Sequence, residues 1–257
     1  MYTQVHKRVA AVFLDIKKAF DSVPHQQLIL ALHCIGIQGP LLNWFWDYLT
    51  SRYQRVVLDG VSPDFIPVTS GVPQGSILVP LIFNIFMNSI SSVPLSGNCR
   101  IVLYADDVLL FKPIDSESDL SDFQTDLENI ISWMTQHGLT PNCDKTHLLP
   151  ISRSRACLPP LTLMINGHIL SPCTSVKYLS VTLSNNLTWG AHIDNVCNST
   201  KRQIGCIHRQ LHYAPPQLRH KIYITTTLPK LEYCSAVWDP HHVKRRQQLE
   251  YVQKFAG

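Results

Sequence analysis

The sequence has no apolar run long enough to cross a lipid bilayer. Its longest such run, Ile77 to Met87, is interrupted by Pro80 and Asn84 and is only about half as long as a membrane-spanning helix. The N-terminal stretch MYTQVHKRV also lacks the apolar centre of a secretory signal peptide. These absences predict a chain that spans no membrane, is not secreted and works inside the cell, in the nucleus or the cytoplasm.

Cysteine and histidine at metal-binding spacings are missing as well. The eight cysteines are scattered, with no Cys-x-x-Cys pair, which argues against a disulfide framework and against a zinc finger. Cys197, Cys206 and His208 are close along the chain, but their helical surroundings favour core packing over metal binding.

Net charge is low but unevenly distributed. The value of +4, with a pI near 8.6, does not by itself indicate a nucleic-acid partner. Lys and Arg number 12 against 15 Asp and Glu in residues 1–200, whereas residues 201–257 carry 10 against 3. This basic part suits attraction to a phosphate backbone, and a solvated basic helix face is the alternative. The stretch from Asp115 to Glu128 has six acids and no Lys or Arg, and it is expected to face solvent. The residues expected to face phosphate include Lys201, Arg202, Arg209, Arg245 and Arg246.

Two adjacent carboxylates, Asp106 and Asp107, stand in the middle of the apolar run IVLYADDVLLF. Neighbouring anions repel, and burying either without a partner is costly, so a positive partner is required. The β-branched and aromatic flanks predict two strands joined at the acidic pair. A carboxylate pair at a rigid hairpin tip suits a hard divalent cation, above all Mg²⁺, and a plain polar β-turn is the alternative.

Asp15 adds a third carboxylate. It follows the apolar run from Arg8 to Leu14, which predicts a strand buried on both faces. If this strand lies beside the hairpin, Asp15 and Asp106 can share two cations about 3.5–4 Å apart, which would activate a 3′-hydroxyl and stabilise a pyrophosphate leaving group. Three carboxylates and two metal ions would form a nucleotidyl-transfer site.

The remaining pattern predicts helices and strands in a chain whose 45% hydrophobic content supports a real core. A hairpin is expected in which residues 52–60 pair with residues 64–72. A second pairing, of residues 161–170 with residues 174–183, is expected around Asn166-Gly167. The other expected elements are helices over His25 to Cys34, Gly39 to Ser51, Ser76 to Ile90, Ser118 to His137 and from Thr188 onward, and a strand over His147 to Ser152.

Five ordered blocks carry a family signal: FLDIKKAFDSVPH (Phe13 to His25), SGVPQGSILVPLIFNIFMNSI (Ser70 to Ile90), LYADDVLLF (Leu103 to Phe111), GLTPNCDKT (Gly138 to Thr146) and VKYLSVTLSNNLTW (Val176 to Trp189). In order and spacing they resemble reverse transcriptases, and in detail the enzymes of non-LTR, LINE-type retrotransposons, particularly the jockey-like kind. The tail LPKLEYCSAVWDPHH (Leu228 to His242) is similar to the segment after the catalytic core of those elements. FLDIKKAFDSV together with LEYCSAVWDP argues against a group II intron maturase or a viral RNA polymerase.

The resemblance implies an α+β fold, the palm of a right-hand polymerase with an antiparallel sheet backed by helices, followed by a partial helical thumb. The implied boundaries are 1–158 for the palm with inserted helical finger and palm elements, 159–185 for a connecting hairpin like a primer grip, and 186–257 for the thumb. The implied partners are an RNA template, a DNA primer and deoxynucleoside triphosphates. Two Mg²⁺ or Mn²⁺ ions would be held by Asp15, Asp106 and Asp107.

Residue roles follow from the same match, each with a plainer alternative. Phe20 aligns with the aromatic gate that leaves no space for a ribose 2′-hydroxyl, and otherwise it is a core aromatic. Gln74 aligns with a residue that contacts the incoming nucleotide or the template, or serves turn chemistry, and Gly75 lets the backbone approach a ligand. Lys145 resembles a general acid or phosphate neutraliser near the leaving group, or is a surface lysine. Ile16 would offer its backbone carbonyl to a metal.

Further expectations concern the primer and three departures from the family. Tyr104 is expected to form a packing platform under the primer end, and Tyr178 belongs to a hairpin that resembles the primer grip. Val79 and Ser180 stand where Gly is usual, and Ser89 stands where an acid is usual. If position 79 requires positive φ or close packing, Val costs about 1–3 kcal/mol there.

Only 14 residues precede Asp15. The resemblance therefore implies that the basic fingers segment of such enzymes is missing and that the chain, truncated at both ends, is an incomplete enzyme. Two interpretations stay open: an RNA-directed DNA polymerase core, and a catalytically inactive retrotransposon remnant that retains nucleic-acid binding.

Overall fold

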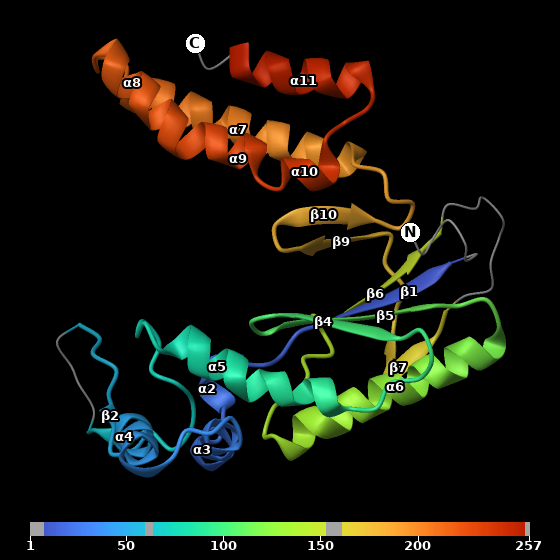
Figure 1. Ribbon diagram of the computed structural model, residues 1–257. Coiled ribbons are helices and arrows are strands. Elements are labelled where there is room, and N and C mark those ends of the chain that lie inside the picture. Colours follow the sequence, from blue (N-terminus) through green and yellow to red (C-terminus); the bar gives the residue numbers. More distant parts are fainter. Residues whose placement is uncertain (1–7, 60–63, 153–160, 255–257) are drawn as a thin grey trace. The chain divides into compact units, whose positions relative to one another are not determined.

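The computed structural model describes residues 8–59, 64–152 and 161–254 (Figure 1). The chain divides into two compact units, Met1–Cys173 and Thr174–Gly257. The first unit combines a sheet with helices, and the second consists of one hairpin followed by helices. Within the described ranges no helix is both long enough and apolar enough to cross a membrane.

The first unit is built on an antiparallel sheet with the strand order β4-β5-β1-β6. All six residues of β1 are buried, which confirms the predicted strand buried on both faces. The sequence VAAVFL suits this interior position because it has no polar side chain that would need water. The strands are β1 (Val9–Leu14), β4 (Arg100–Tyr104), β5 (Asp107–Pro113) and β6 (His147–Ile151).

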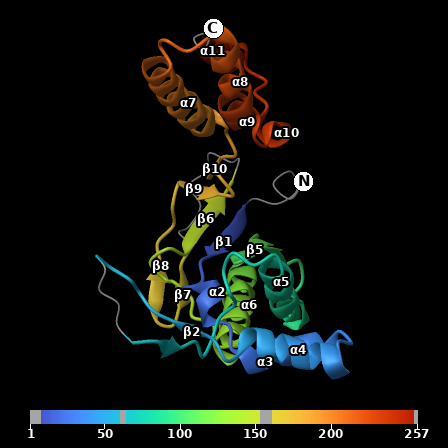
Figure 2. The same ribbon diagram turned by 90° about the vertical axis from the view of Figure 1, so that its left-hand side faces the viewer.

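Helices cover one face of this sheet (Figures 1 and 2). Ala10, Val12 and Leu14 alternate along β1 and share the main hydrophobic core with Phe83 and Phe86 of α5. The helical elements of the first unit are α2 (Ala19–Ser22), α3 (His25–Cys34), α4 (Gly39–Leu49), α5 (Val79–Asn88), the 3₁₀ helix η1 (Ser89–Ser92) and α6 (Glu117–Gln136).

Local sequence signals account for most of these bounds. The predicted helix over His25 to Cys34 is confirmed at both ends, and α6 lies within one residue of its predicted bounds. At the start of α6, Ser116 and Asp119 form a capping box in which each side chain accepts a hydrogen bond from the other's backbone N–H. The predicted hairpin after α4 is confirmed but short: β2 (Tyr53–Gln54) pairs with β3 (Ile66–Pro67), and 60–63 lie outside the described residues.

The predicted pairing of 161–170 with 174–183 is wrong in its partners. β7 (Leu163–Ile165) pairs with β8 (His168–Leu170) around Asn166-Gly167, so the predicted turn is confirmed. Residues 175–184 instead fold on themselves, as β9 (Ser175–Tyr178) and β10 (Val181–Ser184). The Asn-Gly signal fixes the turn, but it does not determine how far each strand extends.

The prediction that the acidic stretch faces solvent is wrong for Asp126, which is 2% exposed. Its carboxylate accepts hydrogen bonds from the backbone N and the Oγ of Ser96, at 2.7 and 2.6 Å. Nζ of Lys112, itself a buried residue, lies 3.9 Å from the Asp126 carboxylate and donates to Ser96 Oγ at 2.6 Å. An acid can be buried here because β5 brings a cation to α6.

The second unit has a small core of its own. Ile193, Cys197 and Ile204 of α7 share it with Leu231 and Trp238. Cys197 is fully buried, which confirms core packing for this cysteine. The helices are α7 (Gly190–Gln210), α8 (Pro216–Ile222), the π-helix η2 (Tyr223–Thr227), α9 (Leu228–Glu232), α10 (Ser235–Trp238) and α11 (Val243–Lys254).

Candidate active site

Strand register places Asp15 beside the acidic hairpin. In the antiparallel pairing of β1 with β5, Leu14 is opposite Val108, so the next pair along the two strands is Asp15 and Asp107. Directly opposite residues of an antiparallel pair point to the same face of the sheet. Because Leu14 points into the main core, Asp15 and Asp107 lie on the face away from α5 and α6.

Tyr104 belongs to the same face. It pairs with Asp107 across the β4–β5 hairpin and is 63% exposed, whereas Asp15, Asp106 and Asp107 are half-buried. An exposed ring next to half-buried carboxylates leaves this part of the sheet accessible to a ligand.

The hairpin predicted at the acidic pair is confirmed. Ala105 and Asp106 form a two-residue turn between β4 and β5. Ala105 has a φ of 53°, in the left-handed region that residues with a side chain rarely adopt. Two-residue hairpin turns of the favoured kinds need at least one such φ, because it matches the twist of the flanking strands.

The electrostatics of the site favour a cation. Burial, followed by repulsion from the Asp106 and Asp15 carboxylates, raises the pKa of Asp107 above its ordinary value. A divalent cation would relieve that repulsion, and carboxylate oxygens are the ligands that Mg²⁺ and Mn²⁺ prefer. Within the described ranges no group of three or more His, Cys, Asp or Glu side chains is close enough to enclose a metal ion. The three carboxylates nevertheless supply the oxygen ligands and the negative charge that such an ion takes.

Asp15 is held by the loop between α6 and β6. Asn142 Nδ2 donates to Asp15 Oδ2 at 2.8 Å, and Thr146 Oγ1 accepts from the Asp15 backbone N at 3.4 Å. Ile16, expected to offer a carbonyl, is buried and forms a β-bridge with Pro141 of this loop. Sequence reasoning missed Asn142, because an Asn after Pro looks like ordinary turn chemistry.

Lys145 lies in the same loop with an exposed side chain. Its backbone N–H donates to the carbonyl of Asn142 at 3.2 Å, which ties Lys145 to the segment that contacts Asp15. The exposed position suits both of the predicted alternatives, a phosphate-neutralising lysine and a surface lysine.

Phe20 is half-buried, and its ring packs on that of Phe83, with centroids 4.3 Å apart and planes inclined at 31°. Phe20 and Phe83 also line a cavity of about 470 Å³, whose other lining residues are Pro80, Asn84, Met87 and Asn88 of α5 and Leu103, Tyr104 and Ala105 of the hairpin. None of the three carboxylates lines this cavity. Phe20 thus has core contact on one side and a cavity next to the acidic hairpin on the other.

The segment that contains Gln74 and Gly75 is hydrogen-bonded to α2 and to the residue that follows it. Gln74 Nε2 donates to Asp21 Oδ1 at 2.9 Å, and Gly71 N donates to Val23 O at 2.8 Å. Gly71 and Gly75 share a φ of 88°, but their surroundings differ. A Cβ on Gly71 would lie 2.8 Å from Asp21 Cα, whereas a Cβ on Gly75 would meet no atom within 4 Å. Gly75 therefore borders open space, and its role in the approach of a ligand stays a prediction, whereas Gly71 is a packing position that sequence reasoning missed.

Two of the basic residues expected to face phosphate have partners inside the second unit. Arg245 Nη1 donates to Asp194 of α7 and to Gln248 Oε1. Arg246 Nε donates to the carbonyl of Pro240 at 2.8 Å. Both side chains therefore help to hold α11 in place.

The other three differ in exposure. Lys201 is half-buried, with Nζ 5.0 Å from the centroid of the Tyr251 ring, whereas Arg202 and Arg209 are exposed on α7. An exposed guanidinium group on a helix can bind phosphate, whereas a guanidinium group that is paired with a carboxylate inside the unit is less available for it.

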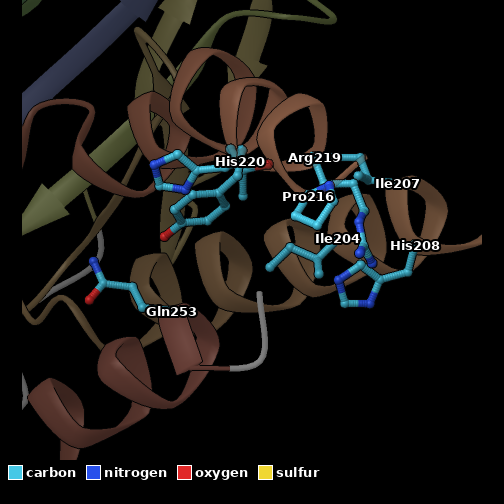
Figure 3. A pocket seen from close by; sticks show the side chains of 9 residues that line it. Ile204, Ile207, His208, Pro216, Arg219, His220 and Gln253 are labelled. Carbon is cyan, nitrogen blue, oxygen red and sulfur yellow. The ribbon is translucent and has the colours of Figure 1, made fainter. Parts of the chain in front are cut away.

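The second unit also contains an open pocket of about 370 Å³ (Figure 3). Arg219 and His220 of α8 and His208 of α7 supply polar side chains, and Ile204 and Pro216 supply apolar ones. No sequence motif predicts this pocket, because its lining comes from separate helices.

The departures from the family fall at three different kinds of position. Val79 is the first residue of α5 and does not have a positive φ, so the first of the two conditions for strain is not met, and its burial in the main core leaves close packing as the other. Ser180 has a φ of 66° in the β9–β10 turn, beside Leu179 at 45°, so glycine would suit that position. Ser89 is half-buried at the start of η1.

Tyr178, which belongs to the hairpin that resembles the primer grip, is half-buried at the end of β9.

Comparison with known proteins identifies the fold class first. A telomerase from Candida tropicalis, solved in complex with a TWJ fragment of telomeric RNA, aligns with a TM-score of 0.54 and 10% identity, covering 98% of this chain and 38% of that one. The predicted α+β fold of a right-hand polymerase is confirmed.

The sequence profile of the family described as reverse transcriptase (RNA-dependent DNA polymerase) matches residues 2–183, and the chain belongs to this family. The Retrovirus-related Pol polyprotein from type-1 retrotransposable element R2 of Popillia japonica is 27% identical over 245 residues, 88% of this chain and 38% of the relative. The RNA-directed DNA polymerase from mobile element jockey of Drosophila melanogaster is 27% identical over 198 residues, 75% of this chain and 21% of the relative. These relatives confirm the predicted likeness to non-LTR retrotransposon proteins, and the chain spans well under half of their length.

Proposed function

We propose that this chain is the catalytic core of an RNA-directed DNA polymerase of a non-LTR retrotransposon, which extends a DNA primer along an RNA template. The observation that carries the proposal is the strand register that sets Asp15 opposite Asp107 at the tip of the acidic hairpin. Membership of the reverse transcriptase family and the names of the relatives support the same activity.

In this proposal Asp15, Asp106 and Asp107 hold two Mg²⁺ or Mn²⁺ ions, with the carbonyl of Ile16 as a further ligand. When bound, the ions would activate the primer 3′-hydroxyl and offset charge on the pyrophosphate leaving group. Mutual repulsion of the carboxylates supports this role, because it makes them a poor structural cluster without a cation. Lys145 would neutralise phosphate or supply a proton near the leaving group.

The deoxynucleoside triphosphate would lie beside the acidic hairpin. Phe20 would exclude a 2′-hydroxyl, because its ring is supported by Phe83 and borders the cavity next to the hairpin. Gln74 and Gly75 would contact the nucleotide or the template, and Tyr104 would support the primer end.

The proposed organisation is a palm over 1–158, a connecting segment over 159–185 that includes Tyr178 as part of a primer grip, and a thumb over 186–257. Lys201, Arg202 and Arg209 would attract the phosphates of the template–primer duplex. The RNA bound to the telomerase of similar fold supports an RNA partner for this fold.

A single-nucleotide primer extension tests the proposal. The full chain is mixed with an RNA template, a DNA primer, one deoxynucleoside triphosphate and Mg²⁺ or Mn²⁺. Metal-dependent addition is expected, and Asp106→Asn should reduce it by roughly 10² or more, because a ligand and its charge are lost together. Asp47→Asn, which removes an exposed carboxylate on α4, is the matched control. Salt-dependent duplex binding without any extension would instead support the inactive remnant.

A further inference from the structure

Asn142 makes two hydrogen bonds to Asp15, although the two residues are 127 positions apart. Its side-chain Nδ2 donates to Asp15 Oδ2 at 2.8 Å, and its backbone N–H donates to the Asp15 carbonyl at 2.8 Å. One residue therefore holds both the main chain and the carboxylate of a proposed metal ligand.

The loop that carries Asn142 is itself fixed. Thr146, 6% exposed, donates to the Asn142 carbonyl through its backbone N and its Oγ1, both at 2.9 Å. The same Oγ1 accepts from the Asp15 backbone N at 3.4 Å, and Lys17 N donates to Thr140 O at 2.9 Å. Hydrogen bonds of the residues before and after Asn142 in the loop therefore fix the position of its side-chain amide.

The side-chain amide of Asn142 donates to Asp15, one of the neighbouring carboxylates of the site. The β1–β5 register brings Asp15 next to Asp107, and two ionised carboxylates so placed repel each other, which favours rotation of a side chain away from the pair. A hydrogen bond to a charged group opposes that rotation more strongly than one to a neutral group. Each carboxylate oxygen has two lone pairs, so the bond to Oδ2 leaves Oδ1 and one lone pair of Oδ2 for a cation.

We propose that Asn142 is a positioning residue for the metal site, which fixes the Asp15 carboxylate in the orientation that lets Asp15 and Asp107 share a divalent cation. This inference rests on the proposed function, because it requires Asp15 to be a metal ligand. Outer residues that orient a ligand are as much a part of metal affinity as the ligand itself.

Mn²⁺ binding to the full chain, measured from the electron paramagnetic resonance signal of free Mn²⁺ without nucleic acid, tests the inference. Asn142→Ala should weaken binding by about 10- to 100-fold, as removal of a residue that orients a ligand typically does. The backbone hydrogen bond to Asp15 survives this change, so the fold should be retained, which circular dichroism checks. Asn129→Ala is the matched control, because it removes an amide that donates to Pro94 O in the same unit.

Asn142→Leu provides a second variant of similar volume with no donor and no metal ligand, and the same weakening is expected. Wild-type Mn²⁺ affinity in either variant would overturn the inference, provided that Asp15→Asn weakens binding. If Asp15→Asn also binds Mn²⁺ like the wild type, the proposed function fails, and the inference fails with it.

Discussion

At the scale of single residues, the raised pKa of Asp107 has a consequence for stability. Its pKa is raised by burial and by Asp106 and Asp15, so the folded state binds its proton more tightly than the unfolded state. The folded state therefore loses stability as pH rises through the raised pKa.

Asp107→Asn should stabilise the metal-free chain at pH 7, by about 0.2–1 kcal/mol, the range for other partly exposed charge pairs. Below the ordinary pKa of 3.8 the gain should vanish, because wild-type Asp107 is then protonated in both states. Urea unfolding with a chelator at both pH values measures this, with Asp47→Asn as control. A destabilised Asp107→Asn at pH 7 would show that the carboxylate has a structural partner instead.

Residue-level sequence reasoning succeeds where the signal is local and fails where the partner is distant. The acidic hairpin could be predicted because two strand-forming flanks enclose Asp106 and Asp107. Asn142 and Asp126 could not, because their roles depend on Asp15 and Lys112, which only the folded sheet brings near.

At the scale of elements, the segment before α5 depends on one glycine more than on another. Gly71 and Gly75 have the same φ of 88°, but only Gly71 is pressed against the backbone of Asp21. Gly75→Ala should cost about 1 kcal/mol for its left-handed backbone. Gly71→Ala should cost about 1–3 kcal/mol more, because the new Cβ must displace backbone. Urea unfolding of both variants measures the difference, and equal losses would contradict the close approach at Gly71.

The contact between β5 and α6 depends on a buried charge pair. Lys112→Met should destabilise the chain by about 3–5 kcal/mol, because Asp126 would remain buried as an uncompensated anion. Adding Asp126→Asn should recover most of that loss, since no buried charge then remains: Asp122, whose Oδ2 also lies 3.4 Å from Lys112 Nζ, is half exposed. Lys17→Met, at an exposed position, should change little. Unfolding free energies from urea titration decide this. A double variant no more stable than Lys112→Met would mean that Lys112 acts through packing alone.

The bounds of a helix or strand could be predicted where residues that begin or end such an element stand next to it in the sequence. The helix over His25–Cys34 lies between a proline and a glycine and was predicted to the residue, and α6 has its capping box. The two hairpins over 163–184 were mispaired, because alternating apolar residues are compatible with several registers and only tertiary contacts select one.

At the scale of the whole molecule, the basic residues of the second unit divide into structural and exposed ones. A double Arg202→Ala, Arg209→Ala variant should reduce the dependence of duplex binding on salt, by about 0.9 in the logarithmic slope per lost phosphate contact. Arg245→Ala should mainly lower the melting temperature, because it removes the ion pair with Asp194. Fluorescence anisotropy of a labelled RNA–DNA duplex across KCl concentrations measures the slope. An unchanged slope in the double variant would assign these arginines to a solvated surface.

The family and the fold class could be predicted from the sequence because four ordered motifs are spread along the first unit and a fifth lies at the start of the second. The helical second unit extends beyond the family match, which ends at residue 183. There, helical periodicity and basic charge were predictable, but the internal partners of Arg245 and Arg246 were not, because they depend on how α11 packs.

The central claim is that Asp15 and the acidic hairpin hold two divalent ions. The most direct measurement is electron paramagnetic resonance of Mn²⁺ bound to the full chain with an RNA template, a chain-terminated DNA primer and the next deoxynucleoside triphosphate. We predict two Mn²⁺ per chain, about 3.5–4 Å apart and therefore spin-coupled, and loss of the coupled signal in Asp15→Asn. Isolated Mn²⁺ ions alone, or a coupled signal that persists in Asp15→Asn, would contradict the central claim.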